Sequence, residues 1–278
     1  MPSPTISVIT ATAGGRFELL QRKLAALVGQ DLEPTRIQWV ISDDGGREPE
    51  LESLAAQGPP FEIKVVRLPD ASGPGAARNA ALAAAEGDVI YLSDDDCSPS
   101  SGTLRAHAEA VAGGDTVSVG AVRFEPAAGE PTTWTAKRAR WWNVNGANTA
   151  VRADVLREVG GFDESLKGYG VEDVLLGYEL RRRGLRFVGL PAAIAVHYGA
   201  DPMAGDDLLK PESAGRNATL VARRYPQLSM RLGVSLPLLL VKRVLLPPLA
   251  ATFGGRYAAE LAYARGAWEE RRGWRNEA

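Results

Sequence analysis

Cysteine and histidine are scarce in this chain of 278 residues, which has one cysteine, Cys97, and two histidines, His107 and His197. A single cysteine cannot form a disulfide within the chain, so a reducing, cytoplasmic setting is expected. These three residues also lack the spacing that the ligands of a zinc finger have. We expect His107 to be structural, and Cys97 to pack in the interior rather than act as a nucleophile.

An excess of positive charge is also lacking. The chain has 32 Lys and Arg against 34 Asp and Glu, a formal net charge of −2, which excludes a globally basic surface for nucleic acid. Its first residues, MPSPTISVIT, have neither a basic region nor a long apolar run, so no signal peptide is expected. Hydrophobic residues make up 45% of the chain, enough for the core of one large domain or of one domain with an appendage.

Apolar segments in the first 111 residues alternate between the periodicities of strands and helices. This alternation predicts an α/β fold, with a mostly parallel central sheet and helices on both faces. Strands are expected at residues 5–9, 37–41, 63–68 and 89–92, and helices at residues 17–28, 50–56, 76–85 and 104–111. Further along, we expect strands at residues 117–124 and 185–188, a long loop at 126–148, and helices starting near 152 and covering 171–183.

The sequence pattern of residues 201–278 differs from that of residues 1–200. It predicts a helical C-terminal extension to the main domain. Within the extension, residues 232–253 are rich in Leu and Val but contain three prolines and the pair Lys242-Arg243. These features argue against a membrane-spanning helix. Two interpretations stay open for residues 232–253: a helical hairpin packed on the core, and a segment that lies on a membrane surface.

Three adjacent carboxylates, Asp94, Asp95 and Asp96, directly follow the apolar run at residues 89–92. Like charges this close destabilise a fold unless a positive group lies between them. Ligands of open parallel sheets bind beyond the carboxyl ends of the strands, where these residues are expected. Two of the carboxylates, Asp94 and Asp96, can share a divalent cation that also binds a diphosphate. Other polar residues expected at this edge are Thr10, Thr12, Asp43, Asp44 and Arg78.

Two other interpretations of these residues remain open at this point. The three carboxylates can belong to an acidic loop open to water. Gly73 and Gly75, with an acid 19 residues past Gly75, partly match the fingerprint of a dinucleotide-dependent oxidoreductase. Against the oxidoreductase, Arg78 occupies the position of the third glycine, and a complete βαβ unit precedes the motif.

Six segments of the chain follow one another in the order found in family 2 glycosyltransferases: ISVITAT, WVISDDGG, GPGAARNAAL, VIYLSDDDCSP, NGANTAVRADVLREVGGFDE and GYGVEDVLLGYELRRRG. The ordered set resembles that family over about residues 4–200 and does not cover residues 201–278. The resemblance implies a GT-A fold, with a nucleotide-binding half in residues 1–100 and an acceptor-binding half in residues 101–200. It also implies an inverting hexosyltransferase that uses a nucleotide diphosphate sugar, and we expect a UDP-sugar.

The resemblance further implies roles for individual residues. Asp94-Asp95-Asp96 is similar to the family's D-x-D motif, in which Asp96 would be the main ligand of Mn²⁺ or Mg²⁺ and Asp94 a ribose or metal contact. His197 resembles the histidine that completes the metal site. Asp173 resembles the general base that takes the acceptor proton, with Glu172 beside it. The donor-binding set implied by position is Thr10, Thr12, Asp43, Asp44, Arg78, Asp94, Asp95 and Asn148.

The acceptor site is expected around Trp141, Trp142, Asn145 and Gly146. Aromatic faces stack on sugars and Asn side chains hydrogen-bond to hydroxyls, although the two tryptophans can equally be core residues. The acceptor is expected to be a glycan, a lipid-linked glycan, a peptide or a small molecule, with possible peripheral contact to the inner face of the membrane through residues 232–253. A non-catalytic nucleotide-sugar binding module of the same fold remains an alternative.

Overall fold

The chain forms two compact units in the computed structural model, which describes residues 5–125, 130–135, 137–199 and 207–273. The first unit contains residues 1–163 and 173–200, and the second contains residues 164–172 and 201–278. The chain therefore passes between the two units more than once. The short excursion of residues 164–172 into the second unit was not anticipated.

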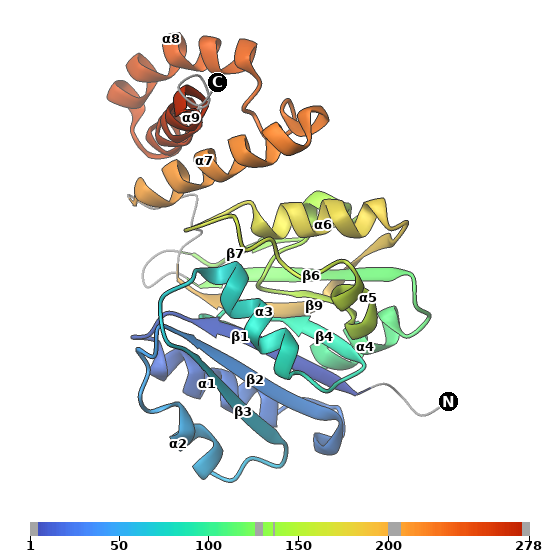
Figure 1. Cartoon of the computed structure of the whole chain (residues 1–278). Helices are drawn as coiled ribbons and strands as arrows, with labels where there is room; N and C mark the ends of the chain where they lie inside the picture. The colour runs from blue at the N-terminus through green and yellow to red at the C-terminus, as the bar shows by residue number, and fades with distance from the viewer. Residues whose placement is uncertain (1–4, 126–129, 136, 200–206, 274–278) are drawn as a thin grey trace. The chain divides into compact units, whose positions relative to one another are not determined.

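A nine-stranded sheet forms the centre of the first unit (Figure 1). Its strand order is β3-β2-β1-β4-β8-β6-β9-β5, and β7 pairs with β6. The strands are β1 (Ile6–Thr12), β2 (Ile37–Asp44), β3 (Glu62–Leu68), β4 (Val89–Leu92), β5 (Cys97–Pro99), β6 (Thr116–Glu125), β7 (Thr132–Trp134), β8 (Thr149–Arg152) and β9 (Arg186–Tyr198).

The first half of the sheet is parallel, as the alternating sequence pattern predicts. Strand β1 pairs in parallel with both neighbours, so that Ile6 lies opposite Ile37 of β2 and Val89 of β4. Strand β3 continues this arrangement on the outer side of β2. The carboxyl ends of β1, β2 and β4 therefore meet at one edge of the sheet, and this edge carries the acidic residues.

The second half of the sheet is mixed rather than parallel. Strand β8 runs antiparallel to both β4 and β6, and β5 runs antiparallel to β9, while β6 and β9 are parallel. Strands β5, β7 and β8 were not predicted, and β7 falls in the expected loop at 126–148, because three or four residues are too few to show a strand periodicity. Strand β9 is far longer than predicted and shifts register against β6 between Gly120 and Ala121.

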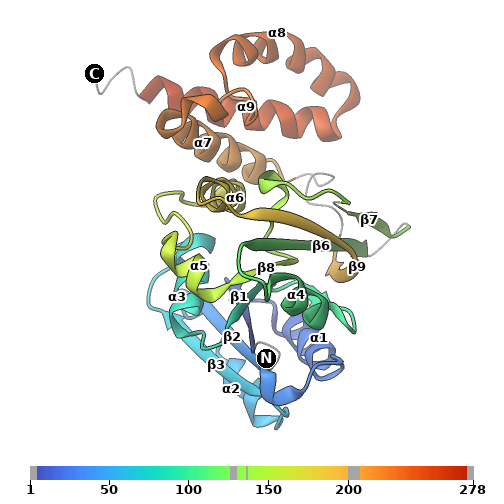
Figure 2. The same ribbon diagram turned by 90° about the vertical axis from the view of Figure 1, so that its right-hand side faces the viewer.

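Helices cover both faces of the sheet (Figure 2). Val8 and Ile9 point to opposite faces, as neighbours in a strand must, and each belongs to a different hydrophobic cluster. The cluster of Val8 includes Leu20 of α1, and that of Ile9 includes Leu82 of α3. The helices of this unit are α1 (Phe17–Val28), α2 (Leu51–Ala56), α3 (Pro74–Ala84), α4 (Thr103–Val111), α5 (Ala153–Glu158) and α6 (Glu172–Arg182), with 3₁₀ turns at Pro34–Arg36 and Trp141–Asn143.

The second unit is a group of helices with a small core of its own. Helices α7 and α9 cross closely at two glycines, because a Cβ on Gly215 would lie 2.0 Å from the Tyr263 carbonyl oxygen and one on Gly266 would lie 2.0 Å from that of Glu212. Residues 164–172 join this unit: Asn217 donates to the Gly170 carbonyl at 3.0 Å. The helices are α7 (Leu209–Arg224), α8 (Leu236–Phe253) and α9 (Gly255–Gly273), with a 3₁₀ turn at Pro226–Leu228.

Residues 232–253 do not form a hairpin, because residues 236–253 make the single helix α8, which pairs with α9. Pro247 and Pro248 lie inside this helix, and only Leu239 and Leu246 are buried. Within the part of the chain that the structure describes, α8 is the one helix that is long and apolar enough to cross a membrane, judged by length and composition alone. One such helix is weak evidence of a span.

Candidate functional site

Four of the predicted site residues meet in one hydrogen-bonded cluster at the carboxyl edge of the sheet. The guanidinium of Arg78, on α3, donates from Nη2 to Asp94 Oδ1 at 2.6 Å and lies with Nη1 3.5 Å from Asp173 Oδ1. The other carboxylate oxygen of Asp173 accepts from the backbone N–H of Gly146 at 2.9 Å. The cluster thus joins the end of β4, the start of α6 and the turn before β8.

Gly146 is packed against the ends of the Arg78 and Asp94 side chains, so that a side chain at residue 146 would displace them. A Cβ on this residue would lie 2.4 Å from Arg78 Nη2 and 2.5 Å from Asp94 Oδ1. Both distances are well inside van der Waals contact. The absence of a side chain at residue 146 is therefore what allows Arg78 to reach both carboxylates.

Asp173 is the more accessible of the two acids that begin α6. Its side chain is 23% exposed, whereas Glu172 is 6% exposed as a whole residue. Val171, just before them, has a φ of 77°, a left-handed conformation that is rare for a β-branched residue. Such strain is retained where the surrounding structure fixes a residue at a functional position.

Asp96 and His197 form a second group at the same edge of the sheet. The antiparallel pairing of β5 and β9 sets Cys97 opposite His197, and the N–H of Tyr198 donates to the Asp96 carbonyl at 2.9 Å. This pairing brings His197 Nε2 to 3.5 Å from Asp96 Oδ1. The two side chains are only 14% and 18% exposed.

The residues around His197 fit a bound divalent cation. His197 Nδ1 is buried without a hydrogen-bond partner, and ligand atoms of Asp96, Cys97 and His197 lie within 4.8 Å of one another. Burial raises the pKa of the Cys97 thiol well above its usual value. Sulfur is also a poorer ligand for Mg²⁺ and Mn²⁺ than carboxylate oxygen. A carboxylate and an imidazole are ligands that Mn²⁺ takes readily, with Mg²⁺ as the harder alternative.

A buried lysine on α1 forms hydrogen bonds to the backbone of the turn that carries the three aspartates. Lys23 Nζ donates to the carbonyl oxygens of Ser93 and Asp94 at 3.0 and 2.6 Å, and to Thr10 Oγ1 at 3.1 Å. Burial lowers its pKa to about 8, an effect partly offset by the charges of the nearby aspartates. The Lys23 ammonium is therefore a positive charge close to the three adjacent carboxylates. The sequence held a signal for it, because Lys23 lies on the apolar face of α1 beside Leu20, Leu24 and Leu27.

Replacing Lys23 with Met is expected to loosen the acidic turn and to lower the free energy of unfolding. The substitution leaves buried carbonyl oxygens unpaired, which costs about 1–3 kcal/mol of folding free energy. Urea unfolding measures the effect. Lys64→Met, at a half-exposed lysine that pairs with Glu86, is the matched control. A Lys23→Met protein with unchanged stability would contradict this role.

Three residues of the predicted donor-binding set are instead used inside the fold, and all are 0% exposed. The Thr10 hydroxyl accepts from Lys23 Nζ and from Trp39 Nε1 at 3.0 Å. Asp43 pairs with Arg67 and accepts from two backbone N–H groups. The Asn148 side chain is hydrogen-bonded to Tyr91, to His107 Nε2 and to two carbonyl oxygens.

His107 is a structural residue, as predicted. Both of its ring nitrogens are hydrogen-bonded, to Ser118 at 2.7 Å and to Asn148 at 2.8 Å. Burial lowers the pKa of His107 to about 4 and keeps the imidazole neutral. Asn148 and His107 therefore belong to a buried network of hydrogen bonds rather than to the site.

Asp44 organises the glycine-containing loop before α3. Its carboxylate accepts from the backbone N–H groups of Ser72 at 2.6 Å and Gly73 at 2.9 Å. These donors are therefore occupied within the protein, and Arg78 is the group from this segment that is placed to meet an anion. Asp44 is 7% exposed, at the rim of the edge.

Thr12 and Asp95 lie close together at the end of β1. Thr12 is 2% exposed, and its hydroxyl accepts from the Gly14 N–H at 3.3 Å. Burial raises the pKa of Asp95, the charge of Asp96 adds to this shift, and a hydrogen bond to Thr12 opposes it. Asp94, Asp95 and Asp96 are all half-buried.

The predicted acceptor residues divide into buried and accessible ones. Trp141 is 3% exposed and packs edge-on against the rings of Trp142 and Tyr178, each with a centroid distance of 5.3 Å. The Asn145 side chain accepts from the N–H groups of residues 147 and 148 and so shapes the turn that carries Gly146. Trp142 is half-buried, with the Arg140 guanidinium over its ring.

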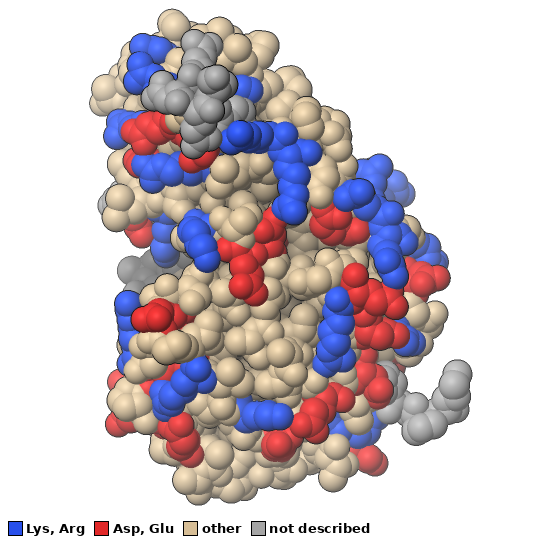
Figure 3. All heavy atoms as spheres, viewed as in Figure 1, with Lys and Arg blue, Asp and Glu red and all other residues tan. Residues whose placement is uncertain are grey.

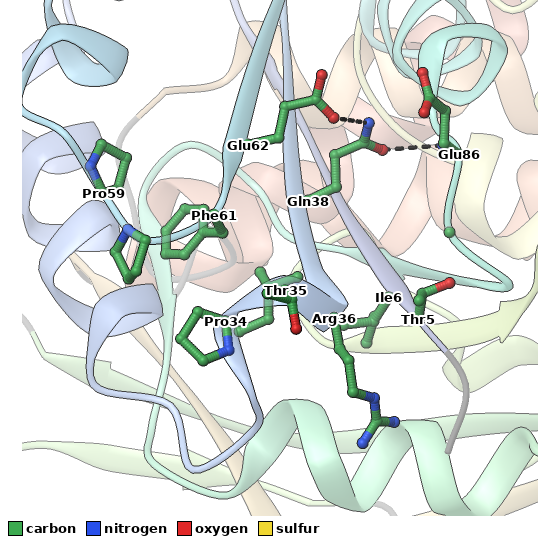
Figure 4. A pocket seen from close by; sticks show the side chains of 13 residues that line it. Thr5, Ile6, Pro34, Thr35, Arg36, Gln38, Pro59, Phe61, Glu62 and Glu86 are labelled. Carbon is green, nitrogen blue, oxygen red and sulfur yellow. Dashed lines mark hydrogen bonds between the residues drawn. The ribbon is translucent and has the colours of Figure 1, made fainter. Parts of the chain in front are cut away.

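An open pocket of about 620 Å³ lies at the other edge of the sheet, at the amino ends of β1, β2 and β3 (Figure 4). Gln38 bridges this pocket, because its side chain donates to Glu62 at 2.7 Å and accepts from the Glu86 N–H at 2.9 Å. Ligands of open α/β sheets bind beyond the carboxyl ends of the strands. The pocket is therefore distinct from the acidic edge, which is the candidate active site.

Comparison with known proteins shows the family to which this chain belongs. The sequence profile of "Glycosyl transferase family 2" matches residues 7–168, more than half of the chain. The chain belongs to this family. Among curated proteins, the pre-mycofactocin glycosyltransferase of Mycobacterium tuberculosis is 29% identical over 220 residues, which cover 72% of this chain. The chain spans 45% of the length of that relative.

Solved structures confirm the GT-A fold of this family 2 protein. The mannosyltransferase PcManGT of Pyrobaculum calidifontis, in complex with GDP-Man and Mn²⁺, superposes with a TM-score of 0.60 at 19% identity and covers 97% of this chain and 75% of its own. S. aureus TarS 1–349, in complex with UDP-GlcNAc, superposes with a TM-score of 0.55 at 18% identity and covers 97% of this chain and 92% of its own. At these identities the likeness shows the fold alone.

Proposed function

We propose that this protein is an inverting glycosyltransferase that uses a nucleotide diphosphate sugar and a divalent cation. The observation that carries the proposal is the meeting of Asp94, Asp173 and Arg78 beside the pair of Asp96 and His197, at the edge of the sheet where GT-A proteins are expected to bind ligands. The structural relatives named above were solved with GDP-Man and Mn²⁺ or with UDP-GlcNAc. A UDP-sugar is our first choice of donor.

Asp96 and His197 would hold the cation, with Asp94 as a further ligand or a ribose contact. A bound cation supplies positive charge to a leaving diphosphate. Arg78 adds a guanidinium at the same place and is suited to a phosphate oxygen. Thr12, Asp44 and Asp95 line the rest of the proposed donor side, and Thr10, Asp43 and Asn148 are left out because their side chains are engaged inside the fold.

Asp173 is the proposed general base. In a single displacement, the acceptor oxygen forms a bond to the anomeric carbon while the bond from that carbon to the phosphate oxygen breaks, and the diphosphate leaves with the bonding electrons. The acceptor hydroxyl must lose its proton as it attacks, and a fixed carboxylate can take it. The Gly146 N–H and the Arg78 guanidinium orient Asp173 and stabilise its negative charge.

The acceptor would approach from the side of Trp142 and Gly146. Trp142 is the accessible tryptophan of the pair, and its ring can stack on a sugar or another flat apolar surface, while Trp141 supports it from the core. Glycan, lipid-linked, peptide and small-molecule acceptors remain candidates.

Isothermal titration of nucleoside diphosphates in the presence of Mn²⁺ tests the donor and metal sites together. We expect one nucleoside diphosphate to bind, and we expect Asp96→Asn to weaken its binding about tenfold, because the variant loses a charged ligand. Asp115→Asn, at an exposed aspartate outside the site, is the control. If no nucleotide binds to the parent protein with Mn²⁺, the proposed function is wrong.

A further inference from the structure

Helix α8 exposes apolar side chains along most of its length. Val244 is 71% exposed, Leu245 55%, Val241 51% and Leu240 48%, and Phe253 at its end is 68% exposed. Only Leu239 and Leu246 of this helix are buried. Single exposed apolar residues are ordinary, but a continuous strip on one helix marks a surface that another body covers.

This strip, defined by Leu240, Val241, Val244, Leu245 and Phe253, carries no negative charge. Helix α8 contains no acidic residue. Of its two charged residues, Lys242 is paired with Glu260 of α9 and is only 14% exposed, whereas Arg243 is exposed. At the top end of the molecule in the view of Figure 3, tan and blue atoms predominate over red ones. An apolar partner bearing negative charge therefore fits this helix better than a neutral or positive one.

A groove of about 290 Å³ between α8 and α9 adds a positive site next to the strip. Three arginines line it, Arg243, Arg265 and Arg272, together with Trp268. The Arg243 guanidinium lies 5.3 Å above the centre of the Trp268 ring, while Arg265 and Arg272 are exposed. The groove's acid, Glu269, is paired with Arg216. Guanidinium groups recognise phosphate by paired hydrogen bonds.

Charge is distributed unevenly between the two parts of the sequence. Residues 201–278 contain twelve Lys and Arg against eight Asp and Glu, a net charge of +4. The remaining 200 residues contain twenty against twenty-six, a net charge of −6. The helices that carry the apolar strip are thus the part of the chain that an anionic surface attracts.

We propose that α8 docks this protein on an anionic lipid bilayer, with the strip inserted among the acyl chains and the arginine groove holding a lipid phosphate. Helix α8 would lie in the plane of the interface, because its partner α9 covers the opposite side and the cations Lys242 and Arg243 fall in its middle. Tyr257 and Trp268 are of the aromatic types that favour this boundary. Bilayer docking is independent of the proposed sugar transfer.

Vesicle flotation of the full chain tests this docking. We expect the protein to float with vesicles of equimolar phosphatidylcholine and phosphatidylglycerol, to bind vesicles of phosphatidylcholine alone much less, and to be released by salt. Val244→Asp, at the most exposed position of the strip, is expected to reduce flotation at least about tenfold. Val28→Asp, at a half-exposed valine on α1, is the matched control and should float like the parent.

A second pair of variants tests the arginine groove. The double variant Arg265→Gln/Arg272→Gln is expected to lose about 30-fold in affinity for anionic vesicles and little for neutral ones. Arg186→Gln, at an exposed arginine of β9, is its control. Circular dichroism confirms that each variant is folded. Free inorganic phosphate, added as competitor at constant ionic strength, should not release the protein. Release under that condition would assign the groove to a soluble phosphate ligand and overturn bilayer docking.

Two results would overturn bilayer docking outright. One is a parent protein that stays at the bottom of the gradient with every vesicle. The other is flotation that Val244→Asp leaves unchanged. If the parent fails to float and instead forms a dimer that Val244→Asp dissociates in light scattering, the strip is an interface between two copies of this chain.

Discussion

Replacing Asp173 with Asn is expected to lower kcat for sugar transfer about a thousandfold while leaving the affinity for nucleoside diphosphate within about twofold of the parent. The substitution keeps the shape of the side chain, and its carbonyl oxygen can still accept from the Gly146 N–H. It replaces the basic carboxylate, which takes the acceptor proton, with an amide that cannot take it. Product formation by mass spectrometry, with nucleotide binding by calorimetry, measures the two effects.

The control for this experiment is Glu179→Gln on the same helix, where the glutamate pairs with Arg182 away from the site. It should retain the activity of the parent. If Asp173→Asn transfers sugar as fast as the parent, another group is the base. If neither protein transfers or hydrolyses any donor while both bind nucleotide, the chain is a binding module built on the same fold.

Gly146→Ala is expected to reduce kcat/KM about a hundredfold, the second large effect. The new methyl group would lie 2.4 Å from Arg78 Nη2 and 2.5 Å from Asp94 Oδ1, so that the guanidinium must move away from both carboxylates. Displacement of a positioned group by about 1 Å costs roughly this much in rate. The backbone of residue 146 is not in the left-handed region, so Ala is compatible with its conformation. Steady-state kinetics measures the effect.

Gly113→Ala is a matched control, because a Cβ on Gly113 would have no atom within 4 Å and its φ is also not positive. It should leave both activity and stability unchanged. Gly146→Ala should melt close to the parent, because the affected groups are polar and partly exposed. Full activity in Gly146→Ala would show that the contact between Arg78 and Asp94 does not matter for the reaction.

Much of the fold could be predicted because its first half follows simple periodicities. The parallel strands β1 to β4 and their helices each show a clear pattern over several residues, and their order sets the acidic residues at one edge. Strands β5 and β8 have no such pattern. Their places depend on pairing with distant residues, as when Cys97 meets His197 a hundred positions away, so the mixed half of the sheet could not be anticipated.

The chemistry of the site could be predicted in part, but not which side chains face outward. Asp43 and Asp44 are neighbours at the end of β2, and they turn to different loops, Asp43 to the N–H groups of residues 47 and 48 and Asp44 to those of residues 72 and 73. The Asn148 side chain is likewise hydrogen-bonded within a buried network around His107. The sequence predicts which polar residues lie at the end of a strand. Whether each side chain faces the solvent or is hydrogen-bonded inside the protein depends on its neighbours in the folded structure.

The most direct test of the proposed active site is an anomalous diffraction map from crystals grown with Mn²⁺ and the nucleoside diphosphate that binds in calorimetry. We predict a manganese peak bonded to Asp96 and His197, with a diphosphate oxygen as a further ligand and Arg78 beside the phosphates. A nucleotide bound elsewhere, or bound at this edge with no manganese at Asp96 and His197, would contradict the account.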